Sequence, residues 1–182
     1  MRPIETKSIA FLVALSIVTF ATVSCNRFES ASTVASTSQA AAIRYVDDTA
    51  KVIDEPSRQE LETTLAALKK RKKIDFSVVT VASTGKTSAY DYSLLLARER
   101  KSHSNDKTAI AGLLLLVAVD DRSWHIQITR NLEDDLTKEI LTNLSKPMQD
   151  SFRQKRYGEG VVKYVNTLIA KLDQIEVFEA EE

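Results

Sequence analysis

Residues 109–136 read AIAGLLLLVAVDDRSWHIQITRNLEDDL, and this stretch decides the fold class. The unbroken apolar run over residues 109–119 predicts a strand buried on both faces, which a sheet needs only where helices cover both sides. Asp120 and Asp121 then form a tight turn, and residues 122–130 alternate as an antiparallel partner strand. The stretch therefore predicts an α/β fold, a three-layer α/β/α sandwich with a small mixed sheet.

The sequence before this stretch supplies a further strand and two helices. Asp54 can cap a first helix, and a second helix is predicted over residues 89–101. Residues 74–82 alternate and are rich in β-branched side chains, which predicts a strand. Because a helix joins this strand to the buried one, we expect the two to be parallel.

The sequence after the hairpin is predicted to be helical. From about Glu133 apolar residues recur at helical spacing, which predicts a helix that Pro147 interrupts. The two glycines in residues 158–160 predict a change of chain direction. A last helix is expected over residues 161–175, where apolar side chains recur at spacings of four and three.

Composition excludes several classes of function. The chain has 182 residues, and its 25 basic residues balance 25 acidic ones, so no global charge draws it to nucleic acid. Cys25 is the only cysteine. A disulfide, a zinc site of several thiolates or an iron–sulfur cluster therefore cannot form within one chain.

The N-terminus, residues 1–24, has the features of a secretory signal peptide. A basic start precedes an apolar run over residues 9–23, which is short for a membrane-spanning helix of about twenty residues. Thr22 to Cys25 reads TVSC and resembles a bacterial lipobox, which would make Cys25 the lipidated first residue of the mature protein. The expected place is then the cell envelope, membrane-anchored and facing the periplasm or the exterior. A soluble cleaved protein and an uncleaved anchor remain open.

The rest of the chain divides into three parts by composition. Residues 25–42 are rich in Ser, Thr and Ala and are predicted to be a disordered tether. Residues 43–176 carry the α/β pattern, and residues 177–182 form an acidic tail.

Several short pieces of the folded part stand in a characteristic order and spacing. They are Tyr45-Val46-Asp47-Asp48, residues 74–81, Asn105-Asp106-Lys107, residues 112–119, Asp120-Asp121-Arg122, residues 126–128, Leu132-Glu133, and residues 152–160 with the sequence FRQKRYGEG. In this order and spacing the pieces resemble the TPM domain, and the resemblance covers about Tyr45 to Leu172. This family includes thylakoid-lumen and bacterial envelope proteins and is often called phosphatase-like.

One five-residue segment departs from the family pattern, and it is called the glycine step below. Where the family usually has Gly-Tyr-Gly-Leu-Glu after the last strand, this chain has Thr129-Arg130-Asn131-Leu132-Glu133. Glycine lets backbone N–H groups approach an anion closely, and side chains at these positions would obstruct that approach. The resemblance therefore carries over acidic positions, and not a phosphate-binding glycine step.

Carboxylates and one amide at loop ends are candidate ligands for calcium or magnesium, because both cations prefer oxygen ligands. If the hairpin turn points away from the other loops, only the remaining candidates can converge. Ordinary local roles as turn residues, helix caps and first-turn charges are the favoured alternative, since no metal-binding loop with a full ligand spacing is present. The candidate metal ligands are Asp47, Asp48, Asn105, Asp106, Asp120, Asp121 and Glu133.

No complete set of catalytic residues is present. The two histidines, His103 and His125, lie in no motif, and His125 is expected to line a sheet face. No Gly-x-Ser-x-Gly supports a serine triad, and Gly85-Lys86-Thr87 lacks the earlier glycine of a P-loop. The basic residues 69–73 either contact anionic lipid or complement a helix C-terminus.

These observations leave two functions open. The first is a binding or membrane-complex support module, held at the membrane through Cys25 with an unidentified envelope protein as its partner. The alternative, implied by the family resemblance, is a divalent-metal-dependent phosphomonoesterase of acid-phosphatase-like activity.

Overall fold

The computed structural model describes residues 44–103 and 108–176 of the chain. The predicted signal peptide, tether and acidic tail lie outside the described residues, as do Cys25, Asn105 and Asp106.

A four-stranded mixed sheet forms the centre of the domain, with strand order β1-β2-β3-β4. β2 and β3 are parallel, and β3 and β4 form an antiparallel hairpin, as predicted. β1 pairs with β2 in the parallel direction. β1 was not expected as a strand, because its three residues carry no periodic signal and pair with β2 alone. The strands are β1 (Val46–Asp48), β2 (Ile74–Val81), β3 (Ala111–Ala118) and β4 (Ser123–Ile128).

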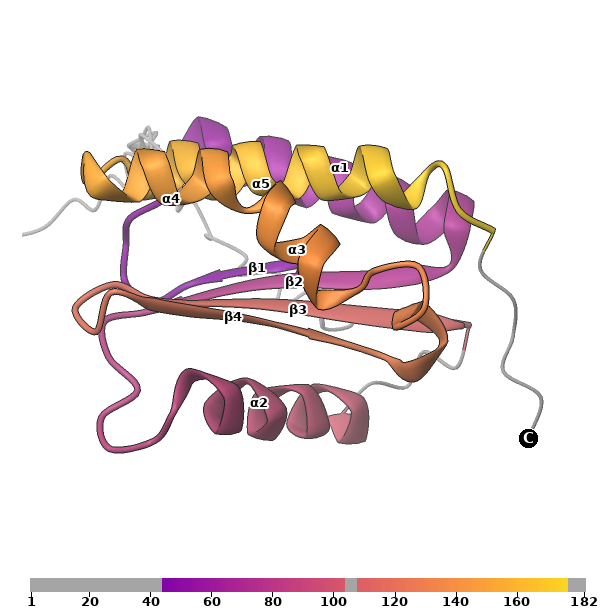
Figure 1. Cartoon of the computed structure of the whole chain (residues 1–182), viewed down its shortest axis with the longest axis horizontal. Helices are drawn as coiled ribbons and strands as arrows, with labels where there is room; N and C mark the ends of the chain where they lie inside the picture. Colours follow the sequence, from indigo (N-terminus) through magenta and orange to yellow (C-terminus); the bar gives the residue numbers. More distant parts are fainter. Residues whose placement is uncertain (1–43, 104–107, 177–182) are drawn as a thin grey trace, which may run out of the picture. The chain divides into compact units, whose positions relative to one another are not determined.

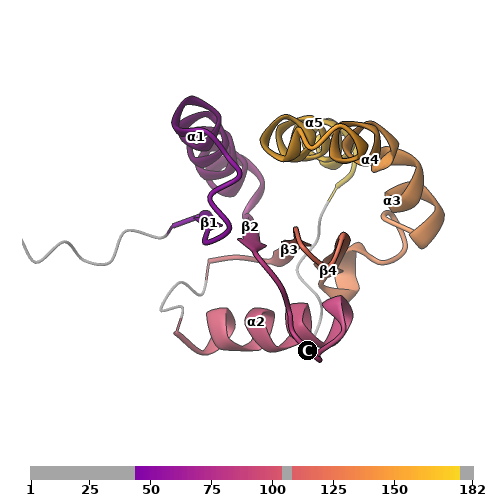
Figure 2. The same ribbon diagram turned by 90° about the vertical axis from the view of Figure 1, so that its left-hand side faces the viewer.

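Helices cover the sheet on both sides, which confirms the three-layer sandwich. Figures 1 and 2 show α1, α3, α4 and α5 on one face and α2 on the other. The helices are α1 (Glu55–Lys72), α2 (Ala89–His103), α3 (Lys138–Leu144), α4 (Lys146–Arg153) and α5 (Tyr157–Leu172).

The buried residues form two hydrophobic clusters of unequal size. The larger lies between the sheet and the helices opposite α2, and Phe76, Leu115 and Tyr164 in it are fully buried. The smaller lies beneath α2, around Leu114 and Leu116. Successive residues of a strand point to opposite faces, so β3 needs apolar side chains at every position, as its sequence shows.

The segment after β4 corrects one prediction. A helix was expected from about Glu133, but α3 begins at Lys138, where the Thr137 side chain caps the helix. A short 3-10 helix (Arg130–Leu132) and a turn fill the gap. The helical spacing of Leu132 and Leu136 is satisfied by one turn, in which the Leu136 N–H donates to the Leu132 carbonyl at 2.8 Å.

The glycines of residues 158–160 correct a second prediction, the change of chain direction. They do not change the chain direction, because both lie inside α5, which begins at Tyr157. A Cβ on Gly158 would lie 2.9 Å from the Val52 carbonyl oxygen, and one on Gly160 would lie 2.8 Å from the Phe152 ring. These glycines therefore serve close packing. The predicted interruption near Pro147 is confirmed, since α3 ends at Leu144 and α4 begins at Lys146 with Pro147 in its first turn.

Candidate functional site

The carboxyl ends of β1, β2 and β3 lie at one edge of the sheet, because these strands are parallel. Figure 1 shows the loops that follow them at the left of the domain. Asp47 and Asp48 end β1, and Asp120 and Asp121 follow β3 at the same edge. Four of the seven predicted ligands therefore share this edge.

Glu133 lies at the opposite edge. It follows β4, whose last residue, Ile128, pairs with Leu113 near the start of β3. The antiparallel direction of β4 thus carries Glu133 away from Asp48. A site that combines these two carboxylates is not formed within one chain.

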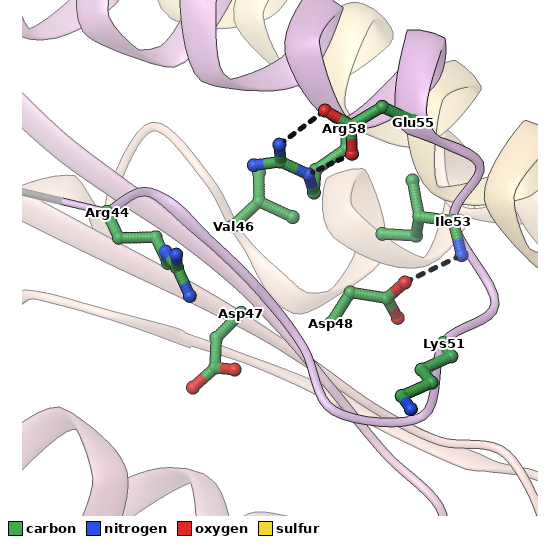
Figure 3. A pocket seen from close by; sticks show the side chains of 8 residues that line it. All are labelled: Arg44, Val46, Asp47, Asp48, Lys51, Ile53, Glu55 and Arg58. Atoms are coloured by element: carbon green, nitrogen blue, oxygen red, sulfur yellow. Dashed lines mark hydrogen bonds and ion pairs between the residues drawn. The ribbon is translucent and has the colours of Figure 1, made fainter. Parts of the chain in front are cut away.

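The Asp48 carboxylate holds the β1–α1 loop. It accepts the Val52 N–H at 3.1 Å, the Ile53 N–H at 2.9 Å (Figure 3) and the Thr80 hydroxyl. Thr80 is fully buried on β2, opposite Asp48 in the strand register. Asp48 therefore links its own loop to the neighbouring strand.

Asp121 plays a similar part between the hairpin and the β2–α2 loop. It accepts the Ser83 hydroxyl and the Thr84 N–H, each at 2.7 Å, and the Thr84 hydroxyl at 3.0 Å. These donors, the Thr84 N–H foremost, hold the pKa of Asp121 below its ordinary value. The hairpin turn thus points toward the β2–α2 loop.

The other two carboxylates of this edge are exposed. Asp47 accepts only the Thr49 hydroxyl, at 3.1 Å, and the Asp120 side chain has no hydrogen bond within residues 44–103 and 108–176. Over those same residues, no group of three or more His, Cys, Asp or Glu side chains is placed to hold a metal ion.

A shallow, open pocket of about 380 Å³ lies between β1 and the start of α1 (Figure 3). Arg58 and Glu55 form a two-point ion pair there, with contacts of 2.6 and 2.8 Å, which lowers the pKa of Glu55 to about 2. The sequence analysis did not single out the basic side chains of this pocket, Arg44, Lys51 and Arg58. They come from the residue before Tyr45 and β1, from the β1–α1 loop and from α1, and they line one pocket only in the folded domain. The lining residues are Arg44, Val46, Asp47, Asp48, Lys51, Ile53, Glu55 and Arg58.

Polar side chains occupy the step where the family usually has glycines. The Thr129 hydroxyl accepts the Gly112 N–H at 3.0 Å and donates to Asn131 Oδ1 at 2.8 Å. Asn131 in turn donates to the Ile110 carbonyl at 2.7 Å. The side chains of this segment therefore bind the backbone at the start of β3.

Side chains of the basic run at the end of α1 contact neighbouring parts of the domain. Lys69 is buried and lies 3.5 Å from the Asp75 carboxylate, and Arg71 pairs with Asp173 at 2.9 Å. Lys72 donates to the Ile175 carbonyl at 2.9 Å. These contacts join the end of α1 to β2 and to the chain after α5.

His125 lines the sheet face beneath α2, as predicted. It is half-buried, and its ring meets Tyr90 edge-on at 5.2 Å between ring centres. Burial lowers the pKa of His125, and the side chain of Gln127 partly opposes that shift.

Within the part of the chain that the structure describes, no helix is both long and apolar enough to cross a bilayer.

Comparison with known proteins gives one family and several structural relatives. The model of the TPM domain matches residues 46–171. No curated protein sequence matches the chain. The N-terminal domain of a protein from P. gingivalis is 25% identical with a TM-score of 0.64, and the match covers 76% of this chain and 88% of that one.

Two more distant solved structures share the fold. The BA42 protein of the psychrophilic bacterium Bizionia argentinensis is 17% identical, with a TM-score of 0.57 over 71% of this chain and 86% of that one. The N-terminal domain of cg2496 from Corynebacterium glutamicum is 12% identical, with a TM-score of 0.52, and the match covers 78% of this chain and 84% of that one.

Proposed function

The chain belongs to the TPM domain family, and on that premise we propose that it is an extracytoplasmic binding module that supports a membrane complex. A lipid on Cys25 would anchor it, and residues 25–42 would hold the domain off the membrane. The basic start, short apolar run and TVSC sequence support this part of the proposal.

The observation that carries the proposal is that the Asp48 carboxylate is occupied by hydrogen bonds within the domain. Oδ1 accepts the Val52 N–H and the Thr80 hydroxyl, and Oδ2 accepts the Ile53 N–H. A carboxylate has about four acceptor positions, so three of them are used, two by backbone N–H groups and one by the Thr80 hydroxyl. A phosphatase would need such a carboxylate for a metal ion or an attacking water.

The filled glycine step supports the same proposal. Thr129 and Asn131 direct their polar atoms to Gly112 and Ile110 of the neighbouring chain segment. Backbone N–H groups that face open space are the usual means of binding a phosphate. Here the Gly112 N–H already has a side-chain acceptor.

A phosphomonoesterase is the second candidate, and the pocket beside β1 favours it. Arg44, Lys51 and Asp47 are exposed side chains that line this pocket. Two cations can hold a phosphate group, and an exposed carboxylate can contribute to binding a divalent cation.

Hydrolysis of p-nitrophenyl phosphate by the chain truncated to residues 41–182, with calcium, magnesium or manganese, separates the two functions. Both hydrophobic clusters lie within residues 45–175, so we expect this part to fold on its own. The binding module predicts no turnover above the blank. Metal-dependent turnover that Asp47→Asn abolishes, and that Asp134→Asn at the opposite edge preserves, would instead establish the enzyme.

The anchor is tested separately with the full chain in a bacterial host. Labelled palmitate and membrane fractionation would compare the wild type with Cys25→Ser. We expect the substitution to remove the label and to release the protein from the membrane fraction. Unchanged label would refute lipidation at this cysteine.

A further inference from the structure

Among the described residues, the outer face of α2 carries an exposed apolar side chain on which no other element packs. The large exposed hydrophobic side chains are Tyr90 and Leu95, exposed by 52% and 58%, and both lie on α2. The Tyr90 ring lies against His125 of the sheet, so Leu95 is the apolar side chain of the outer face. Figure 2 shows α2 alone beneath the sheet, with none of the described elements on its far side. Such exposed apolar side chains commonly mark an interaction site.

The residues of this face recur at helical spacing. Asp91, Leu94, Leu95 and Arg98 stand at positions i, i+3, i+4 and i+7, which places them within an arc of about 100° on a helix. Asp91, Leu95 and Arg98 are exposed and Leu94 is half-buried, whereas Ser93 is fully buried toward the sheet. These four residues form a stripe along α2, and the stripe points away from the core.

The stripe is complementary to itself. We propose that α2 packs antiparallel against α2 of a second copy of this chain, with the two-fold axis passing between Leu94 and Leu95. Asp91 and Arg98 are equally distant from that axis, so each Asp91 meets Arg98 of the partner. The leucines of the two copies meet at the centre. Such an isologous contact uses one patch twice.

The charged ends of the stripe fit this pairing. Arg98 forms no hydrogen bond or ion pair with any residue that the structure describes, so its guanidinium is available to a partner. Asp91 receives the Ser88 hydroxyl on Oδ2 at 2.7 Å, which leaves Oδ1 for a second donor. A parallel pairing would place like charges level with each other, so the charges select the antiparallel arrangement.

The size of the surface sets the strength of the dimer. α2 has 15 residues, which corresponds to a length of about 22 Å. A contact along one such helix buries less than the roughly 1,200 Å² typical of stable complexes, so we infer a weak, reversible dimer. Anchoring to a membrane, as in the proposed function, would raise the local concentration and favour it. The inference itself does not depend on that function.

Leu95 gives a test that exploits the symmetry. At the axis Leu95 lies beside its own copy, so both Leu95→Lys and Leu95→Glu place like charges together. Sedimentation equilibrium of the chain truncated to residues 41–182, up to millimolar concentration, should show a monomer–dimer equilibrium for the wild type. Each variant alone should be monomeric, and an equimolar mixture of the two should dimerise again.

Two controls accompany this test. Ala170→Lys adds the same charge to an exposed position of α5, far from α2, and should leave the dimer unchanged. Arg98→Glu should weaken the dimer through repulsion from Asp91 of the partner. Circular dichroism of each variant checks that it is folded.

Three results would overturn the inference. The wild type could remain monomeric at millimolar concentration. The dimer could persist in Leu95→Glu, which would place the contact elsewhere. Finally, the folded Leu95 variants could each be monomeric and fail to associate on mixing.

Discussion

Replacing Asp48 with alanine should destabilise the domain far more than replacing the neighbouring Asp47. The Asp48 carboxylate accepts two backbone N–H groups of the β1–α1 loop and the hydroxyl of Thr80. Alanine removes all three acceptor contacts and supplies none. The folded state then keeps three donors in place without their acceptor.

Burial sets the size of the effect. Thr80 is fully buried and Ile53 is 7% exposed, and an unpaired buried donor costs about 1–3 kcal/mol. Val52 is half-buried, so water can replace part of its lost bond. We therefore expect Asp48→Ala to lower the free energy of unfolding by about 3 kcal/mol. For a domain of this size that corresponds to a fall in Tm of about 10 °C.

Urea and thermal unfolding, followed by circular dichroism, would measure the loss. Asp47→Ala is the matched control, because Asp47 is exposed and, among the described residues, accepts only the Thr49 hydroxyl. Its free energy of unfolding should stay within about 0.5 kcal/mol of the wild type. Thr80→Val combined with Asp48→Ala should lose about 1 kcal/mol less than the sum of the single changes, since no hydroxyl remains unpaired.

Equal stability of the Asp48→Ala and Asp47→Ala variants would refute this reasoning. It would mean that the loop hydrogen bonds are replaced by water at no cost. Asp48 would then be free for another role, and the strongest argument against a catalytic carboxylate at this position would be lost.

Three further predictions concern packing and titration. Gly158→Ala should lower stability by about 1–2 kcal/mol in urea, because overpacking against the Val52 carbonyl outweighs the gain in helix propensity; a more stable variant would contradict this close approach. Tyr164→Phe should match or exceed wild-type stability, since the buried hydroxyl has no partner among the described residues. Burial raises the pKa of Tyr164, so wild-type stability should fall as pH rises above 10.0, a loss that the phenylalanine variant should lack. The pKa of Asp121 is lowered from 3.8, so its contribution is present above that pH and is lost in more acidic solution; acid unfolding of Asp121→Asn should be less steep, and identical curves would contradict the Thr84 contact.

The sequence predicted the layers of the fold well. The apolar run of β3, the alternation of β4 and the leucines of α1 are local signals, and each depends on neighbours a few residues away. The parallel pairing of β2 and β3 followed from the helix between them. The short β1 carried no such signal, because its place depends on pairing with β2 and on the hydrogen bond from the Val46 N–H to Glu62 of α1.

The role of the acidic residues could not be predicted in the same way. Asp48 accepts a hydrogen bond from Thr80, which lies 32 residues away in the sequence. Asp121 accepts one from Thr84, which lies 37 residues away. The candidate site therefore depends on which side chains the parallel edge brings together. The antiparallel direction of β4 likewise places Glu133 at the other edge. The close approach of α5 to the β1–α1 loop requires a glycine at Gly158. Local periodicity determined which segments are strands and helices, whereas the partners of each polar side chain were decided by tertiary structure, because they come from distant parts of the chain.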